Sequence, residues 1–271
     1  IAVVTRVTSG PSWGPGRFQV RAEPMKSVFF AAASGVVLLA LSGAPAQADE
    51  GMWTFDNFPA AKVKSAYGVD IDQAWLDRVR GASIRLTNGC SASVVSPEGL
   101  VLTNHHCVVD CVQALSSGEK DYVQDGFLTD SREEELKCPG QQAEILAEIV
   151  DVTQTVQAAG AGLTGQAFNR ARDAAVAQIE QEACANDAGY RCQVVSLYRG
   201  GQYKLYKYRR YDDVRLVFAP EFATAFFGGD PDNFNFPRFN LDMAFLRLYE
   251  GDQPAATPDH LTWTARAPQE G

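Results

Sequence analysis

The chain has 271 residues, which is enough for one or two domains. Its formal net charge is −9, with 24 Lys and Arg against 33 Asp and Glu. Such an acidic composition repels nucleic acid and anionic lipid, so it argues against both as partners.

The front of the chain has the parts of a secretory leader. Residue 1 is Ile, and the first methionine is Met25, followed by Lys26 and a long uncharged run. That run ends in Ala-Gln-Ala at residues 46–48, a small-x-small sequence typical of a signal-peptide cleavage site. We predict that residues 1–24 lie upstream of the true start and that residues 25–48 form a signal peptide.

A transmembrane anchor is the alternative for the same run. Ser42, Gly43 and Pro45 interrupt it, so it falls short of the roughly 20 consecutive apolar residues that a spanning helix needs. We therefore expect an exported protein, in the periplasm or on the cell surface, without stable membrane insertion after signal cleavage.

All six cysteines follow the predicted cleavage site. An even number in an exported chain indicates disulfides, although composition alone settles no pairing. The cysteines are Cys90, Cys107, Cys111, Cys138, Cys184 and Cys192.

Short strands separated by turn formers begin near residue 82. Residues 96–99 (SPEG) fit a type I turn, so residues 91–95 and 100–103 are predicted to pair as a hairpin. A further strand is predicted within residues 143–153. These features indicate a mainly β protein.

One helix interrupts the strands. Phe168, Ala171, Ala175 and Ile179 recur at three- and four-residue spacing, which predicts an amphipathic helix over about residues 163–184. A disulfide between Cys184 and Cys192 would staple the turn that follows it.

Strand character returns over residues 193–198 and 203–220. The second of these stretches carries several cations between tyrosines, which would suit a nucleic-acid face. Because Asp212 and Asp213 follow immediately, a solvated strand face is the better interpretation. The cations are Lys204, Lys207, Arg209 and Arg210.

Two of the three histidines, His105 and His106, follow the predicted hairpin. Consecutive strand residues point to opposite faces, so the two histidines should not serve one site. A histidine before a half-cystine in a secreted β protein suggests the general base of a chymotrypsin-like peptidase. We assign that role to His106, and a Cys90–Cys107 bridge would pin its loop.

A general base of this kind needs a carboxylate that fixes its tautomer. Asp242 stands before the apolar run of residues 243–246 (MAFL), where an acid is costly to bury without a partner. We therefore predict that Asp242 orients His106. The simpler interpretation is a strand-start acid in water.

A metal site is the competing interpretation of the double histidine. The ligand types suit zinc, but the usual compact spacings are absent, and exported thiols tend to oxidise. We expect no metal. The ligands of such a site would be His105, His106, Cys107, Asp110 and Cys111.

Four motifs together resemble the bacterial dipeptidyl-peptidase 7/11 family, which consists of exported serine exopeptidases. They are GMW at residues 51–53, GCSASVVSPEGLVLTNHHC at 89–107, DGF at 125–127 and FGGDPDNFNFPRFNLD at 227–242. The resemblance implies a chymotrypsin-like double β-barrel with a helical insertion. Residues 49–250 would form the first barrel, and residues 251–271 would begin the connection to the rest.

The resemblance also implies what the site binds. Asn233 matches an asparagine that holds the substrate's α-amino group, and Phe234 replaces a frequent tryptophan beside it. The expected partners are peptides with a free N-terminus, a homodimer is compatible with the family, and no cofactor is required. The source would be a Gram-negative bacterium.

The nucleophilic serine is absent from the sequence by the same comparison. The family carries it in a Gly-Asn-Ser-Gly-type motif, which does not occur here, and Ser91 and Ser93 lack a Gly-rich oxyanion loop. The chain as given is therefore expected to be inactive. A non-catalytic peptide-binding protein and an ordinary secreted endopeptidase remain as alternatives.

Overall fold

The computed structural model describes residues 53–226 and 240–267. The chain divides into two compact units, and all described residues belong to the second one, Met52–Gly271. The predicted signal peptide lies outside the described residues. Among the helices that are described, none combines the length and the apolar character needed to cross a membrane.

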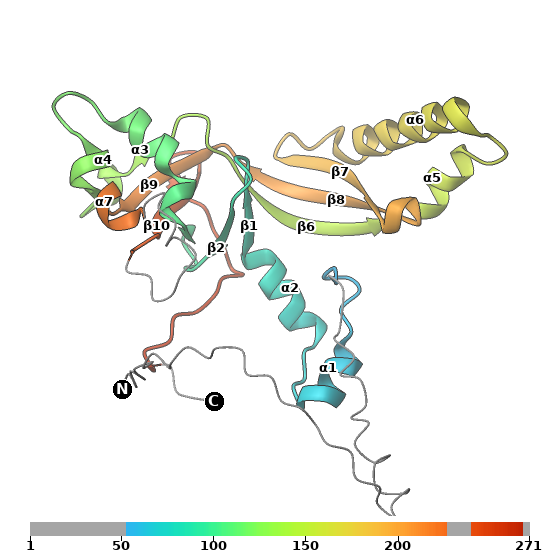
Figure 1. The fold of residues 1–271 in the computed structure, drawn as a ribbon, viewed down its shortest axis with the longest axis horizontal. Helices are drawn as coiled ribbons and strands as arrows, with labels where there is room; N and C mark the ends of the chain where they lie inside the picture. The colour runs from blue at the N-terminus through green and yellow to red at the C-terminus, as the bar shows by residue number, and fades with distance from the viewer. Residues whose placement is uncertain (1–52, 227–239, 268–271) are drawn as a thin grey trace, which may run out of the picture. The chain divides into compact units, whose positions relative to one another are not determined.

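Antiparallel strands form one 11-stranded sheet (Figure 1). Strand β10 pairs with β3, and the sheet then runs through β2, β1 and β6 to β8. Strand β9 pairs with the other edge of β10 and follows β8 after Asp212 alone, so β8 and β9 meet at that residue although they do not pair along their lengths. The predicted mainly β, barrel-type fold is confirmed. The barrel strands are β1 (Ser83–Leu86), β2 (Ser91–Val94), β3 (Leu100–Thr103), β6 (Ala143–Asp151), β8 (Gln202–Tyr211), β9 (Asp213–Ala219) and β10 (Ala244–Glu250).

The core lies inside this barrel and follows the two-residue period of its strands. In β10, Ala244, Leu246 and Leu248 are fully buried, whereas the residues between them are partly exposed. Strand β3 shows the same alternation, with Val101 and Thr103 buried. The sequence therefore fixes which face of each strand turns inward.

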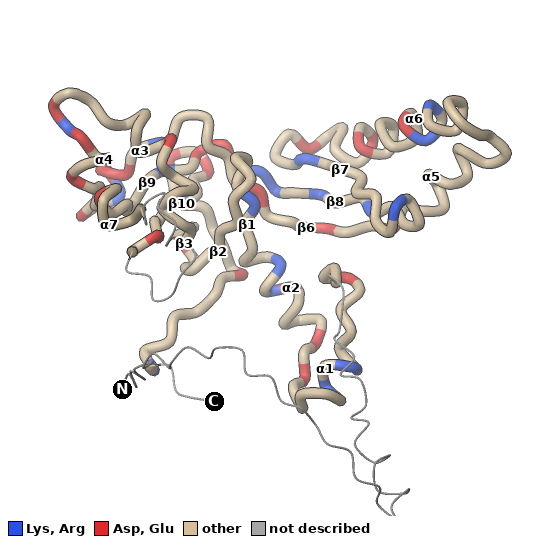
Figure 2. The backbone as a smooth tube through the Cα atoms, viewed as in Figure 1, with Lys and Arg blue, Asp and Glu red and all other residues tan. Residues whose placement is uncertain are grey.

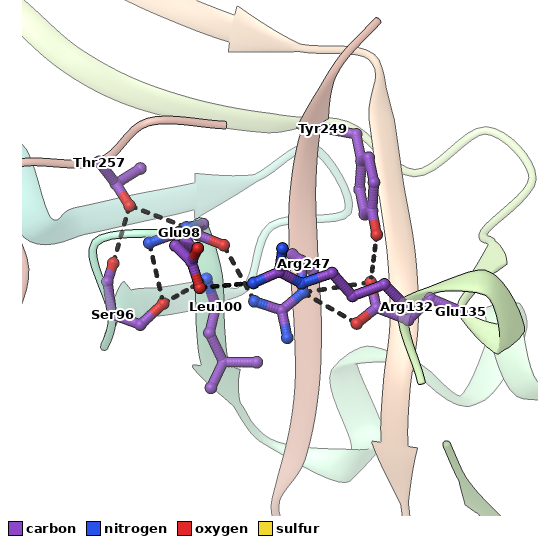
Figure 3. A network of polar contacts seen from close by, with 9 residues as sticks. Ser96, Glu98, Leu100, Arg132, Glu135, Arg247, Tyr249 and Thr257 are labelled. Atoms are coloured by element: carbon purple, nitrogen blue, oxygen red, sulfur yellow. Dashed lines mark hydrogen bonds and ion pairs between the residues drawn. The ribbon is translucent and has the colours of Figure 1, made fainter. Parts of the chain in front are cut away.

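The β2–β3 hairpin forms as predicted, and its turn is tied to the C-terminal segment. The Ser96 hydroxyl accepts hydrogen bonds from the backbone N–H groups of Glu98 and Leu100, at 3.2 and 3.1 Å. Thr257 donates its hydroxyl to the Ser96 carbonyl at 2.8 Å and accepts the N–H of Gly99 at 2.9 Å (Figure 3).

Part of the segment 251–271, in which we predicted the start of a connection, is therefore packed on the barrel. Ala255 and Thr257 are buried, and a short strand β11 (Gln253–Pro254) pairs with β10. Hydrogen bonds to the distant hairpin hold this part of the segment in place.

A buried ion pair links β10 to the segment before β5 (Leu136–Lys137). Glu135, whose side chain is 2% exposed, accepts Nε–H of Arg247 at 2.8 Å and the hydroxyl of Tyr249 at 2.8 Å (Figure 3). Arg247 also donates to the Glu98 carbonyl in the hairpin turn at 2.9 Å. The network locks the outer face of β10 to two other parts of the barrel.

Strands β6 and β8 continue past the barrel as a pair, and β8 pairs on its other edge with β7 (Tyr190–Leu197). Helices α5 (Thr153–Ala159) and α6 (Gly165–Cys184) contact each other and this part of the sheet. The predicted helix is thus confirmed as α6. The Cys184–Cys192 disulfide closes the turn between α6 and β7, as the spacing indicated.

Several short elements were not predicted from the sequence. Helix α2 begins after Asp72, whose carboxylate caps it by accepting the N–H of Trp75 at 2.8 Å. The unpredicted elements have 10 residues or fewer, too few to show a clear periodic pattern. They are α1 (Ala60–Tyr67), α2 (Gln73–Ala82), α3 (Val109–Leu115), α4 (Tyr122–Asp125), β4 (Phe127–Leu128) and α7 (Phe222–Ala225).

We expect Gly99→Ala to destabilise the protein by about 2–4 kcal/mol. Gly99 has φ +70°, and an added Cβ would lie 2.8 Å from the Leu248 carbonyl oxygen, which is backbone and cannot rotate away. Gly118→Ala is the matched control, because a Cβ there meets nothing within 4 Å. Urea unfolding measures both, and equal free energies of unfolding would contradict this account.

We expect Arg247→Met to cost about 3–5 kcal/mol, because it leaves the Glu135 carboxylate buried without its cation. The double variant Glu135→Leu/Arg247→Met removes both charges and should cost clearly less. The measurement is again the free energy of unfolding in urea. A double variant that is less stable than the single one would show that the pair stabilises the fold in its own right.

Candidate active site

The two histidines lie in a 3₁₀ turn, η1 (His105–Cys107), directly after β3. The Cys90–Cys107 disulfide ties this turn to the start of β2, as predicted, with an S–S distance of 2.04 Å. Asn88 adds a hydrogen bond by donating its side-chain amide to the Cys107 carbonyl at 2.7 Å. The disulfide and this hydrogen bond therefore both fix the η1 turn at Cys107.

The turn sends the two imidazoles into different environments. His105 is 3% exposed, whereas the side chain of His106 is 66% exposed. We expected the two histidines not to serve one site because consecutive strand residues point to opposite faces. Their side chains do lie in different environments, but the residues follow a 3₁₀ turn and not the alternation of an extended strand.

Asp242 reaches His106 because of the pairing between β3 and β10. Ala244 is the register partner of Thr103, so the residues before β10 lie beside the residues after β3. His106 Nδ1 lies 2.7 Å from Asp242 Oδ2, and the His106 backbone N–H donates to Oδ1 at 3.0 Å. The structure thus brings together the two predicted residues.

Two opposing effects act on the Asp242 carboxylate. Partial burial raises its pKa, whereas the backbone and side-chain hydrogen bonds from His106 lower it, and the net result is a lowered pKa. Asp242 is therefore ionised over the physiological range. A carboxylate acceptor at Nδ1 selects the tautomer with the proton on Nδ1, which leaves the lone pair on Nε2.

His105 has a structural environment. Its ring is tilted against Phe222 of α7, with centroids 6.2 Å apart, and burial lowers its pKa. Its buried Nε2 has no hydrogen-bond partner within the described part of the chain. A neutral, buried imidazole of this kind packs the η1 turn against α7.

The competing metal site loses its thiolate ligands. Cys107 is bonded to Cys90, and Cys111 is bonded to Cys138, a pairing that the sequence did not suggest. The sulfurs of Cys90 and Cys107 and a ring nitrogen of His106 do lie within 4.8 Å of one another. A thiolate binds metal, whereas the sulfurs of a disulfide carry no negative charge. The Cys90–Cys107 disulfide therefore supports the turn that carries His106.

The basic residues of β8, coloured blue in Figure 2, are each paired with a carboxylate. Lys204, which is largely buried, lies 2.9 Å from Asp56 and 3.0 Å from Asp151. Such pairing leaves little positive charge to attract a phosphate backbone. The remaining pairs are Lys207–Asp187, Arg209–Glu250 and Arg210–Asp212.

A shallow hollow lies beside the His106–Asp242 pair. It is lined by residues of β2 and β3 together with Asp242, and it includes the side chains of Ser91 and Ser93. Within the described residues, neither serine donates a hydrogen bond to His106, whose partner is Asp242. Asn233 and Phe234, the predicted substrate-binding residues, lie outside the described residues.

An antiparallel, barrel-type sheet with an ionised aspartate beside an exposed histidine is consistent with the first barrel of a chymotrypsin-type peptidase domain. The family model described as Peptidase S46 matches residues 48–271. The chain belongs to the Peptidase S46 family.

Individual relatives agree with this assignment. The chain is 36% identical over 228 residues to the Asp/Glu-specific dipeptidyl-peptidase of Shewanella putrefaciens, covering 82% of this chain and 31% of that protein. It is 33% identical over 241 residues to dipeptidyl-peptidase 7 of Porphyromonas gingivalis, covering 84% and 32%. The chain therefore spans about a third of the length of these relatives.

A solved structure shows the same fold. The crystal structure of Porphyromonas endodontalis DPP11 in complex with substrate superposes with a TM-score of 0.71 at 30% sequence identity. The match covers 82% of this chain and 36% of that one. The expected resemblance to the dipeptidyl-peptidase 7/11 family is confirmed.

We expect the contact between His106 and Asp242 to stabilise the fold in a pH-dependent manner. The folded-state pKa of Asp242 lies below its ordinary value of 3.8, so the unfolded chain binds more protons in that range. The contribution is complete above the unfolded-state pKa and is lost as the pH falls through the folded-state pKa.

Asp242→Asn removes this contribution and serves as the comparison. The difference in free energy of unfolding between wild type and Asp242→Asn should be larger at about pH 6 than at about pH 3. Urea unfolding at both pH values measures it. The same difference at both would mean that the carboxylate's charge is not stabilised in the fold.

Proposed function

We propose that the complete protein is an exported serine-type dipeptidyl-peptidase that releases dipeptides from the free N-terminus of peptides. The observation that carries this proposal is the 2.7 Å contact between His106 Nδ1 and Asp242 Oδ2 at the rim of the barrel. The names of the relatives suggest the reaction class. One is an Asp/Glu-specific dipeptidyl-peptidase, and another is dipeptidyl-peptidase 7.

His106 is the general base in this mechanism. Because Asp242 holds the proton on Nδ1, Nε2 accepts the proton of a serine hydroxyl as that oxygen attacks the second peptide bond. The resulting imidazolium lies against the ionised Asp242, which stabilises it. His106 then returns the proton to the leaving amine, and water hydrolyses the acyl-enzyme.

The serine and the oxyanion-binding amides come from a part of the longer protein in this proposal. Ser91 and Ser93 line the adjacent hollow but make no hydrogen bond to His106 within the described residues. The imidazole of His106 is exposed, so a serine from another domain of the longer protein could reach it. The chain's coverage of about a third of its relatives is consistent with this arrangement.

Asn233 and Phe234 bind the substrate's N-terminus in this proposal. An asparagine carbonyl accepts hydrogen bonds from an α-ammonium group, and an aromatic ring favours a cation near its face. Both residues lie in the stretch that leads directly to Asp242 in sequence. Recognition of the amino group would thereby be coupled to the distance at which the second peptide bond reaches His106.

The test uses the complete protein, secreted with its disulfides formed, and a fluorogenic dipeptide amide. Wild type should release the dipeptide when the N-terminus is free and not when it is acetylated, because the acetyl group removes the positive charge. His106→Ala and Asp242→Asn should each lower kcat by about 10⁴-fold or more. His260→Ala is the matched control, because among the described residues the His260 ring hydrogen-bonds to the backbone carbonyls of Thr257 and Pro258 and not to His106 or Asp242.

Each outcome separates the alternatives. Cleavage of the acetylated peptide would indicate an endopeptidase. Peptide binding without turnover by wild type would indicate the non-catalytic binding protein. Retained turnover in His106→Ala would refute the assignment of the base.

A further inference from the structure

The Asp242 carboxylate has a hydrogen-bond donor besides the histidines. Asn104, the residue between β3 and η1, places its side-chain Nδ2 3.0 Å from the Asp242 carbonyl oxygen and 3.3 Å from Asp242 Oδ2. Both neighbours are acceptors, so the amide must present its NH₂ group to them. One side chain therefore holds both the backbone and the carboxylate of Asp242.

Within the part of the chain that the structure describes, the donors to this carboxylate come from one run of three residues. Asn104 and the imidazole of His106 share Oδ2, the His106 N–H takes Oδ1, and the backbone of His105 adds a further hydrogen bond. A carboxylate with donors on both oxygens cannot rotate without losing one of them. The orientation of Asp242 is thus encoded beside the histidine that it orients.

We propose that Asn104 is a positioning residue of the peptidase, acting through Asp242 to hold the His106 imidazole in its working orientation. The amide fixes the plane of the carboxylate, and the carboxylate fixes the ring. Asn104 does not touch the reacting atoms. This inference rests on the proposed function, which gives the His106–Asp242 pair its catalytic role.

A purely structural role for Asn104 is the alternative, since its hydrogen bond to the Asp242 carbonyl also joins two segments of the barrel rim. Asn240 offers the matched control. It too donates its side-chain amide to a backbone carbonyl of another segment, that of Ala225 at 3.1 Å, but its amide makes no contact with Asp242 or His106 among the described residues. Loss of a structural hydrogen bond should lower stability in both alanine variants. An effect on the His106–Asp242 pair should appear only in variants of Asn104.

The first experiment compares Asn104→Ala with Asn240→Ala in the complete protein. Asn104→Ala should lower kcat by about 10- to 100-fold with little change in KM, because substrate binding does not involve the amide. Asn240→Ala should lower the melting temperature and leave kcat within about twofold. Equal effects of the two variants on kcat would overturn the proposal.

The second experiment uses charge. Asn104→Asp keeps the size of the side chain and replaces the donor by a second carboxylate beside Oδ2, which favours the protonated imidazole of His106. The acid limb of the pH profile of kcat/KM should move to higher pH by about half to one unit. The titratable groups that face this position from η1 and the start of β10 are His105, His106 and Asp242, and α7 contributes Phe222.

NMR titration of the His106 ring in the complete protein gives a readout that does not need turnover. Asn104→Asp should shift the titration midpoint upward, and Asn240→Asp should not. Because it is isosteric, Asn104→Asp also remains informative where Asn104→Ala fails to fold. An unshifted midpoint would overturn the role of Asn104, whereas an inactive wild type with a shifted midpoint would overturn only the proposed function.

A double variant closes the argument. In a His106→Ala background, Asn104→Ala should cause no further loss of the residual rate, because the ring that it positions is gone. A loss as large as in the wild-type background would mean that Asn104 acts by another route.

Discussion

The antiparallel pairing of β3 with β10 is the constraint on which the candidate site depends. It sets Ala244 opposite Thr103, so the residues flanking these two positions, Asp242 and His106, meet although 136 positions separate them in sequence. A slip by one residue would turn Leu246 and Val101 out of the core. The hydrophobic pattern that builds the barrel therefore also fixes the geometry of the pair.

Around this pairing, stabilising contacts are concentrated at both ends of β10. At one end the η1 turn, pinned by the Cys90–Cys107 disulfide, encloses the Asp242 carboxylate. Farther along, the buried Glu135 holds Arg247 against the hairpin turn. Because β10 is fixed on either side of its buried centre, the orientation of Asp242 is not left to an isolated loop, and the catalytic proposal needs such rigidity.

Local signals in the sequence predicted what local physics determines. The SPEG turn, the three- and four-residue spacing around Phe168 and the cysteines that flank the α6–β7 turn each act over a few residues, and all three features are present. The His106–Asp242 contact needed knowledge of peptidase chemistry as well as the sequence. The 3₁₀ turn, the Cys111–Cys138 bridge and the Glu135–Arg247 pair arise from tertiary packing, which composition and periodicity do not encode.

The environments of the two histidines explain why only one of them suits proton transfer. His105 is buried against Phe222, and its lowered pKa keeps it neutral, so it cannot take up a proton without losing packing. His106 is exposed, and its Nδ1 is committed to an ionised carboxylate, so a proton arriving at Nε2 creates a charge that is already compensated. The difference comes from one step along a 3₁₀ turn. Two chemically identical neighbours thus acquire separate roles through burial and a single hydrogen bond.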